Sequence, residues 1–243
     1  MTRALIGLDD TDHGDSIGTG ALARELGLYL ERLAGAVSLG ITRHQLLVDP
    51  RIPYTSHNSA ACLAVDSPAP LGQLEELTRG FVTTLLHLGA DPGLCLLEPG
   101  AGDYRELGDF GRRAQTTVLA HEEARELCRR AGLRHHELGG SGLGVLGAAA
   151  ACGLRLGGDD GRFISLPGTR ELDGVLSVGE ILRLSPIERV VDEEARVLDA
   201  GERVDTCGWV RPDLVAGAIV LRTRRTGPGE PYLVERDKHR DKH

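Results

Sequence analysis

Three aspartates crowd into four residues directly behind a short apolar run, and this cluster constrains the chain more than any other feature. The run Ala4–Leu8 is too short for a helix and ends in acids, so it predicts a buried strand. Asp9, Asp10 and Asp12 follow it, with Thr11 between them. Carboxylates this close repel one another unless a cation neutralises them, and Mg²⁺ prefers oxygen ligands and bridges to phosphate. The segment therefore predicts a magnesium site at the end of a strand.

A glycine-bearing loop leads from this strand into a helical pattern that begins near Leu22. Gly18, Thr19 and Gly20 end the loop. Backbone N–H groups at a helix N-terminus bind phosphate, which makes these three residues candidate phosphate ligands. A purely structural interpretation stays open, in which the acids form a turn and Thr19 caps the helix.

Charge and composition limit the partners of the chain. The net charge of −8 has the wrong sign for a dedicated nucleic-acid binder, and 3% aromatic residues leave little for base stacking. No apolar run reaches membrane-spanning length, so we expect a soluble, cytoplasmic protein. The cysteines are scattered and form no Cys-x-x-Cys pair, which argues against a disulfide framework and a structural zinc site. They are Cys62, Cys95, Cys128, Cys152 and Cys207.

The order of expected elements predicts an α/β or α+β fold, with helices packed on mixed sheets. Residues 4–97 read as strand, helix, strand, strand, helix, strand. The polar, turn-rich stretch 100–113 is expected to connect this first domain, residues 1–113, to a second α+β unit over 114–235. The charged tail, residues 236–243, is expected to be disordered.

The second unit is expected to hold a charged helix over residues 121–130 and an Ala-rich helix that ends at Cys152. His135 and His136 lie between them on an extended segment. Neighbouring side chains of a strand point to opposite faces, so the two histidines make a poor metal pair.

Three segments, taken in order, carry a resemblance to a known family. They are residues 6–12 with 18–20, residues 51–54 with 58–61, and residues 142–150. Together they resemble the N-terminal half of the archaeal tRNA-isoleucine agmatinylcytidine synthetase family, TiaS. The resemblance implies a kinase-like domain joined to a ferredoxin-like unit. It also implies that ATP and Mg²⁺ activate a cytidine carbonyl by phosphorylation, before agmatine displaces the phosphate.

The resemblance assigns roles to individual residues. Asp9, Asp10 and Asp12 match the acids that handle Mg²⁺ and the triphosphate, with Thr11 beside the nucleotide. Thr19 aligns with a threonine that takes phosphate from ATP, so it is either a nucleophile or a phosphate ligand and cap. In the glycine-rich third segment, Gly142 and Gly144 are the nucleotide-binding candidates.

The departures from the family matter as well. Residues 55–58 replace a longer stretch that contains permanent cations, and here His57 and Asn58 would face the acceptor. A histidine titrates near neutral pH and could serve an anion or a proton, although a loop histidine bonded to backbone explains His57 equally well. We expect the OB-fold and zinc-ribbon parts of the family to be absent. RNA is therefore not expected as a direct substrate unless a separate RNA-binding subunit is present.

The sequence thus favours an ATP- and Mg²⁺-dependent phosphotransferase or ligase that acts on a small molecule. One alternative is a non-catalytic nucleotide-binding or tRNA-modification accessory module. Another is a haloacid-dehalogenase-like phosphatase built on Asp10 and Asp12, although Gly14 stands where such enzymes carry Thr or Val. The acceptor and the oligomeric state, a homo-oligomer included, stay open, as does whether ATP is cut to ADP or to AMP.

Overall fold

The computed structural model describes residues 1–11, 18–52, 58–85 and 90–235. The chain divides into two compact units, Met1–Ile164 and Ser165–His243. The tail for which we expected disorder lies outside the described residues. Among the described helices, none combines the length and the apolar character needed to cross a membrane.

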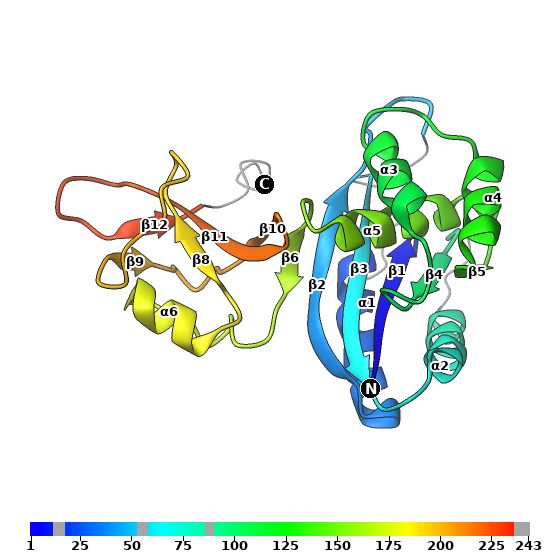
Figure 1. Ribbon diagram of the computed structural model, residues 1–243, viewed down its shortest axis with the longest axis horizontal. Coiled ribbons are helices and arrows are strands. Elements are labelled where there is room, and N and C mark those ends of the chain that lie inside the picture. The colour runs from blue at the N-terminus through cyan, green and yellow to red at the C-terminus, as the bar shows by residue number, and fades with distance from the viewer. Residues whose placement is uncertain (12–17, 53–57, 86–89, 236–243) are drawn as a thin grey trace. The chain divides into compact units, whose positions relative to one another are not determined.

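The first unit is built on an antiparallel sheet with the strand order β5-β4-β1-β3-β2, followed by β6 (Figure 1). Buried aliphatic runs form its central strands, as the apolar segments of the sequence predict. The strands are β1 (Thr2–Asp9), β2 (Val37–Gln45), β3 (Ser59–Ser67), β4 (Gly93–Leu97), β5 (Arg134–Glu137) and β6 (Arg162–Ser165).

The first six elements confirm the predicted order of strands and helices. Helix α1 (Thr19–Ala34) connects β1 to β2, and α2 (Leu71–Thr84) connects β3 to β4. With the strand order β4-β1-β3-β2, this is the ferredoxin-like, split βαβ arrangement. It therefore lies within residues 2–97, whereas we expected the ferredoxin-like unit after residue 113.

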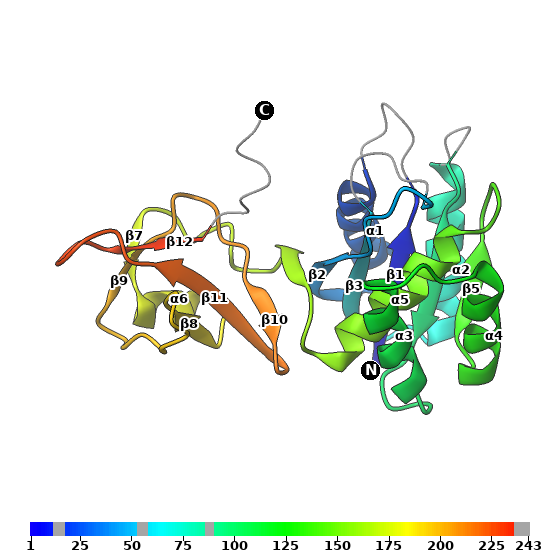
Figure 2. The same ribbon diagram turned by 90° about the horizontal axis from the view of Figure 1, so that it is seen from above.

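Helices α1 and α2 pack on one face of the sheet. The other face is covered by α3 (Arg105–Ala114), α4 (His121–Ala131) and α5 (Gly144–Gly157) (Figure 2). The expected connection over residues 100–113 is largely helix α3, which buries Leu107, Phe110 and Ala114. Because α3 and α4 both pack on α5, the boundary expected after residue 113 falls inside the first unit. The division of the chain comes instead after Ile164.

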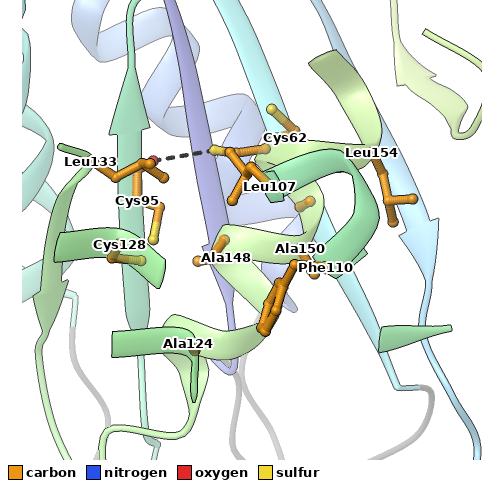
Figure 3. Close-up of a cluster of buried hydrophobic side chains, with 14 of the residues drawn as sticks. Cys62, Cys95, Leu107, Phe110, Ala124, Cys128, Leu133, Ala148, Ala150 and Leu154 are labelled. Atoms are coloured by element: carbon orange, nitrogen blue, oxygen red, sulfur yellow. Dashed lines mark hydrogen bonds between the residues drawn. The ribbon is translucent and has the colours of Figure 1, made fainter. Parts of the chain in front are cut away.

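Side chains alternate between the two faces along β1 and give each helical layer its own core. Ala4, Ile6 and Leu8 face α1 and α2, whereas Leu5 faces α5. The core on the α5 side contains Cys62, Cys95 and Cys128 (Figure 3). It also contains Cys152, and all four cysteines are buried. The Cys128 thiol and burial raise the pKa of Cys95, so this thiol stays protonated. Cys62 and Cys152 thus serve as small core residues.

Helix α5 lies unusually close to the strands because glycines meet across the contact. A Cβ on Gly93 would lie 1.8 Å from the carbonyl carbon of Gly144. A Cβ on Gly144 would lie 2.4 Å from the backbone nitrogen of Gly93. No side chain fits at either position, so these two glycines fix the depth at which α5 begins on the sheet.

The second unit consists of short strands and one described helix. Strand β11 pairs in parallel with β8 and antiparallel with β10 and β12, while β9 pairs with β7 and β12. A capping box of Ser177 and Glu180 starts the helix. The elements are β7 (Val175–Ser177), α6 (Val178–Leu184), β8 (Arg189–Val191), β9 (Arg203–Asp205), β10 (Asp213–Val215), β11 (Ala218–Arg224) and β12 (Tyr232–Val234).

Candidate functional site

The acidic segment lies at the end of β1, as the sequence predicts. Asp9 is the last residue of β1 and pairs with Gly93 of β4. Asp10 follows with a φ of 51°, in the left-handed region that few residues other than glycine adopt. Aspartate tolerates this conformation better than most residues, yet it still carries strain of roughly 1–3 kcal/mol. The turn after β1 therefore depends on its surroundings for its shape.

The N-terminus of α1 lies beside the same turn. The buried Thr11 hydroxyl donates to the Thr19 Oγ1 at 3.0 Å. Gly18 occupies the N-cap position, and its carbonyl accepts from the N–H groups of Ala21 and Leu22. Thr19 is thus the first residue of the helix, and the cap role considered for it falls to Gly18 instead.

Gly20 lies one residue further into α1, in its first turn. The structure therefore brings Gly18, Thr19 and Gly20 to the edge of the sheet where β1 ends.

Helix α5 contacts Asp9 from the other side. A Cβ on Gly147 would lie 1.7 Å from Asp9 Oδ2, so only glycine leaves space for this carboxylate. The contact places the Asp9 carboxylate, at the end of β1, against the first turn of α5. Gly147 belongs to the glycine-rich segment of the sequence, but we did not include it among the candidate site residues.

The N–H groups of the loop before α5 are already bound to a carboxylate of the same chain, that of Asp91. Asp91 Oδ1 accepts from the Gly142 N–H at 2.6 Å. Its Oδ2 accepts from the N–H groups of Ser141 and Leu143 at 2.9 and 3.2 Å, and from the Ser141 hydroxyl at 2.5 Å. A nucleotide that binds the Gly142 N–H, the role expected for this residue, would therefore have to displace the Asp91 carboxylate. Gly144 packs against backbone, which accounts for its lack of a side chain.

The donor set at the end of β1 fits Mg²⁺ bound together with phosphate. Within the described ranges, no three His, Cys, Asp or Glu side chains lie close enough to hold a metal ion by themselves. Mg²⁺ commonly takes one or two carboxylates and completes its shell with phosphate and water. Asp9 and Asp10 can supply such a pair, while the third candidate, Asp12, lies outside the described residues.

The remaining candidates do not gather into the site in the same way. The Asn58 side-chain amide donates to the Leu47 carbonyl at 2.6 Å and so stabilises the segment before β3. His57 lies outside the described residues. His135 and His136 lie on β5, where His136 Nε2 is 2.7 Å from Glu75 Oε1 and His135 Nδ1 is 3.2 Å from the Leu133 carbonyl. His136 thus contacts a side chain of α2, and His135 contacts the backbone just before β5.

Sequence reasoning missed a buried polar chain on the α5 side of the sheet. His44, fully buried on β2, contacts Thr42 Oγ1 at 2.8 Å through Nε2 and Asp160 Oδ1 at 2.7 Å through Nδ1. Gln115 donates to the other oxygen of Asp160. Burial lowers the pKa of His44, against the opposing influence of Asp160. These hydrogen-bonded side chains connect the segment after α5 to β2.

Asp91 was missed as well, although the sequence carried part of its signal. Asp91-Pro92-Gly93 is a turn signature ahead of a strand. That signature indicates a turn but not the partner of the carboxylate, which lies about 50 residues further along the chain.

Sheet, helices and acidic edge together define an α+β fold with a ferredoxin-like core, and comparison with known proteins extends this description. No family model matches the sequence. An uncharacterized protein of Methanocaldococcus jannaschii is 28% identical over 157 residues. The crystal structure of apo TiaS, a tRNA agmatidine synthetase, matches with a TM-score of 0.54 at 25% identity. The complex of TiaS with an isoleucine tRNA and ATP matches with a TM-score of 0.58 at 24% identity, which concerns the fold alone.

These likenesses cover parts of each protein. The match to the Methanocaldococcus jannaschii protein covers 63% of this chain and 50% of that protein. The match to apo TiaS covers 62% of this chain and 35% of the TiaS chain. The match to TiaS in the complex covers 75% of this chain and 44% of the TiaS chain. The fold of this chain is therefore similar to part of TiaS, as the sequence segments predict.

Proposed function

We propose that this chain is an ATP- and Mg²⁺-dependent phosphotransferase or ligase that activates a small-molecule acceptor by phosphorylation. The observation that carries the proposal is the pair Asp9 and Asp10 at the end of β1, beside the first residue of α1. The similarity in fold to TiaS, one structure of which contains ATP, supports nucleotide binding by this chain.

The residues of the site would have two roles: the aspartates would bind the metal ion, and the first turn of α1 would position the phosphates. Asp9 and Asp10 would hold the metal ion through their carboxylates, and Asp12 is proposed as a third ligand. When bound, Mg²⁺ would neutralise charge that develops on the phosphate oxygens. The first turn of α1, with Gly18, Thr19 and Gly20, would direct N–H groups toward phosphate.

Thr19 fits the role of a phosphate ligand better than that of a nucleophile. The Thr11 hydroxyl donates to Thr19 Oγ1, which engages a lone pair of that oxygen and fixes its direction. A nucleophile would need the same lone pairs for attack and a base to take its proton. We therefore propose that Thr11 and Thr19 orient the triphosphate rather than accept its terminal group.

The surface charge favours a small acceptor. The arginines of α3, α4 and β5 are each within ion-pair distance of a carboxylate of the chain, for example Arg105 with Asp103 and Arg130 with Glu106. Paired arginines offer less charge to a phosphate backbone, and the net charge of −8 opposes a polyanion further.

The proposal is tested by ATP affinity measured with and without Mg²⁺, for wild type and Asp10→Asn. Asparagine tolerates the left-handed backbone of residue 10, so the variant loses charge and not the turn. We expect Mg²⁺ to tighten ATP binding by about tenfold in wild type, equivalent to ~1.4 kcal/mol, and to have little effect in the variant. Asp103→Asn, which removes an exposed carboxylate at the start of α3, is the control. Equal ATP affinity in every arm would contradict a role for Mg²⁺ and Asp10 in binding the nucleotide.

A second candidate, a tRNA-modification function, is favoured by one observation. The TiaS structure with which this chain shares its fold contains an isoleucine tRNA. Incubation with ATP and either a metabolite extract or total tRNA, followed by analysis for ADP and AMP, separates the two. Nucleotide turnover that depends on tRNA favours the second candidate, and turnover with metabolites favours the first.

A further inference from the structure

Asp91 precedes β4, and its carboxylate is bound by the loop before α5. An ionised carboxylate has about four lone-pair sites. Asp91 accepts four hydrogen bonds, from three backbone N–H groups and the Ser141 hydroxyl. Three of these bonds go to Oδ2 and one to Oδ1, so the carboxylate is largely taken up by the loop before α5, while the backbone of Asp91 lies next to the proposed metal ligand Asp10.

The backbone of Asp91 contacts the turn after β1, which contains Asp10. Its N–H donates to the carbonyl of Asp10 at 3.2 Å. Asp10 has the strained left-handed conformation described above, and a hydrogen bond to its carbonyl helps to hold that conformation. One residue therefore bonds both to the turn after β1 and to the loop before α5.

The loop that Asp91 holds also controls the position of Asp9. It leads directly into α5, whose Gly147 lies against the Asp9 carboxylate. Gly140 and Gly142 both have positive φ, of 56° and 80°, so the loop curls around the Asp91 side chain. If the carboxylate were lost, the loop would lose its partner and the start of α5 would be less firmly placed beside Asp9.

We infer that Asp91 is a positioning residue of the proposed ATP site. Through its N–H it fixes Asp10, and through its carboxylate it fixes α5 against Asp9, so that both carboxylates stay aligned for one metal ion. Asp91 also fills the anion-binding N–H groups before α5, which leaves the first turn of α1 as the phosphate-facing helix end. The inference rests on the proposed function and names a residue that contacts neither metal nor nucleotide.

Two variants of Asp91 separate its charge from its acceptor atoms. Asp91→Asn keeps the size and one acceptor oxygen, whereas Asp91→Ala removes every side-chain acceptor. Asp103→Asn is the matched control, because Asp103 also accepts from a backbone N–H, that of Arg105, but lies at the start of α3. All proteins are full-length and are assayed at a temperature where their far-UV circular dichroism matches that of wild type.

The first measurement is hydrogen exchange of the ligand-free chain. We expect Asp91→Ala to raise exchange about tenfold in peptides covering residues 139–146 and to raise it in peptides covering residues 7–11 as well. Asp91→Asn is expected to lie between wild type and Asp91→Ala. An increase confined to residues 139–146 would overturn the inference, because the loop would then not be coupled to the acidic turn.

The second measurement is the ratio of ATP dissociation constants without and with Mg²⁺. We expect the ratio to fall about tenfold in Asp91→Ala, to recover in part in Asp91→Asn and to stay at the wild-type value in Asp103→Asn. A purely structural role would lower the melting temperature and leave the ratio unchanged, and that result would overturn the inference alone. A wild-type protein whose ATP affinity ignores Mg²⁺ would contradict the proposed function and remove this inference with it.

Discussion

Helices α1 and α5 both begin at the edge of the sheet where β1 ends, yet their N-termini differ in what they contact. The loop before α5 wraps around the carboxylate of Asp91. At α1, the N-cap position is held by Gly18, where no described side chain caps the helix, and Thr19 meets Thr11. Similar glycine-bearing loops therefore serve different purposes in one unit.

The difference shows that the glycines of a loop before a helix primarily determine the conformation of the loop and do not by themselves indicate a ligand. Glycine allows positive φ and close approach, and either a ligand or a side chain of the chain can take the N–H groups that result. At α5 the internal carboxylate takes them, and the glycines also let the helix settle on the strands. In this account α5 is a structural brace and α1 is the helix that faces the nucleotide.

The largest expected effect compares one alanine in each helix. In Gly144→Ala the new Cβ would lie 2.3–2.4 Å from backbone atoms of Asp91 and Gly93, which cannot move aside, and we expect a loss of about 3 kcal/mol in unfolding free energy. In Gly20→Ala the nearest atom, at 2.9 Å, is the terminal methyl carbon of Ile164, which can rotate, so the change should stay within about 1 kcal/mol.

Urea unfolding of both variants checks this difference. Equal losses in the two proteins would contradict the assignment of α5 as the braced helix.

Gly147→Ala sharpens the comparison at the point where α5 meets the site. The added Cβ would displace the Asp9 carboxylate, since it would lie 1.7 Å from Oδ2. We expect the Mg²⁺ enhancement of ATP affinity to fall about tenfold, with a stability loss of about 1–3 kcal/mol. Isothermal titration calorimetry with ATP, with and without Mg²⁺, measures this change in affinity.

The matched control is Gly80→Ala in α2, where nothing lies within 4 Å of the new Cβ. Full retention of the Mg²⁺ effect in Gly147→Ala would show that Asp9 is not a ligand.

A smaller effect is expected beyond the other end of α5, where Asp160 binds the buried His44. Burial lowers the pKa of His44 from its ordinary value of 6.5, with Asp160 opposing and Arg155 assisting the change. The folded chain thus binds fewer protons than the unfolded chain as the pH falls below 6.5. Stability should then decrease by at most ~1.4 kcal/mol per pH unit from this group.

The contribution of His44 is isolated by comparing wild type with His44→Gln in urea unfolding between pH 6.5 and 5.0. We expect a shallower slope in the variant and an unchanged Mg²⁺ effect on ATP binding at pH 7.5. Identical slopes would mean that the histidine is not held neutral by burial.

Much of the first unit could be predicted from the sequence, because local patterns determine it. Alternating and continuous apolar runs gave the order of elements through residue 97, and Asp9 and Asp10 lie at the strand end as predicted. Helix α3 was missed because polar and charged residues surround its few buried positions, so the segment resembled a connection. The ferredoxin-like topology was predicted in order but assigned to the wrong part of the chain.

Other features depend on contacts between distant segments, which no local pattern encodes. Asp91 meets residues about 50 positions away, and His44 meets Asp160 across 116 positions. The space for Asp9 depends on a glycine of α5 far along the chain. A sequence read by itself therefore names the acids of the site and leaves out the residues that hold them.

The most direct test of the account is a crystal structure of the full chain with Mn²⁺ and a non-hydrolysable ATP analogue, with the metal located by its anomalous signal. The account predicts the metal between the carboxylates of Asp9 and Asp10 and the phosphates at the first turn of α1, with Asp91 still bonded to the loop before α5. Phosphates seated on residues 141–143 in place of the Asp91 carboxylate, or a metal ion away from both aspartates, would contradict it.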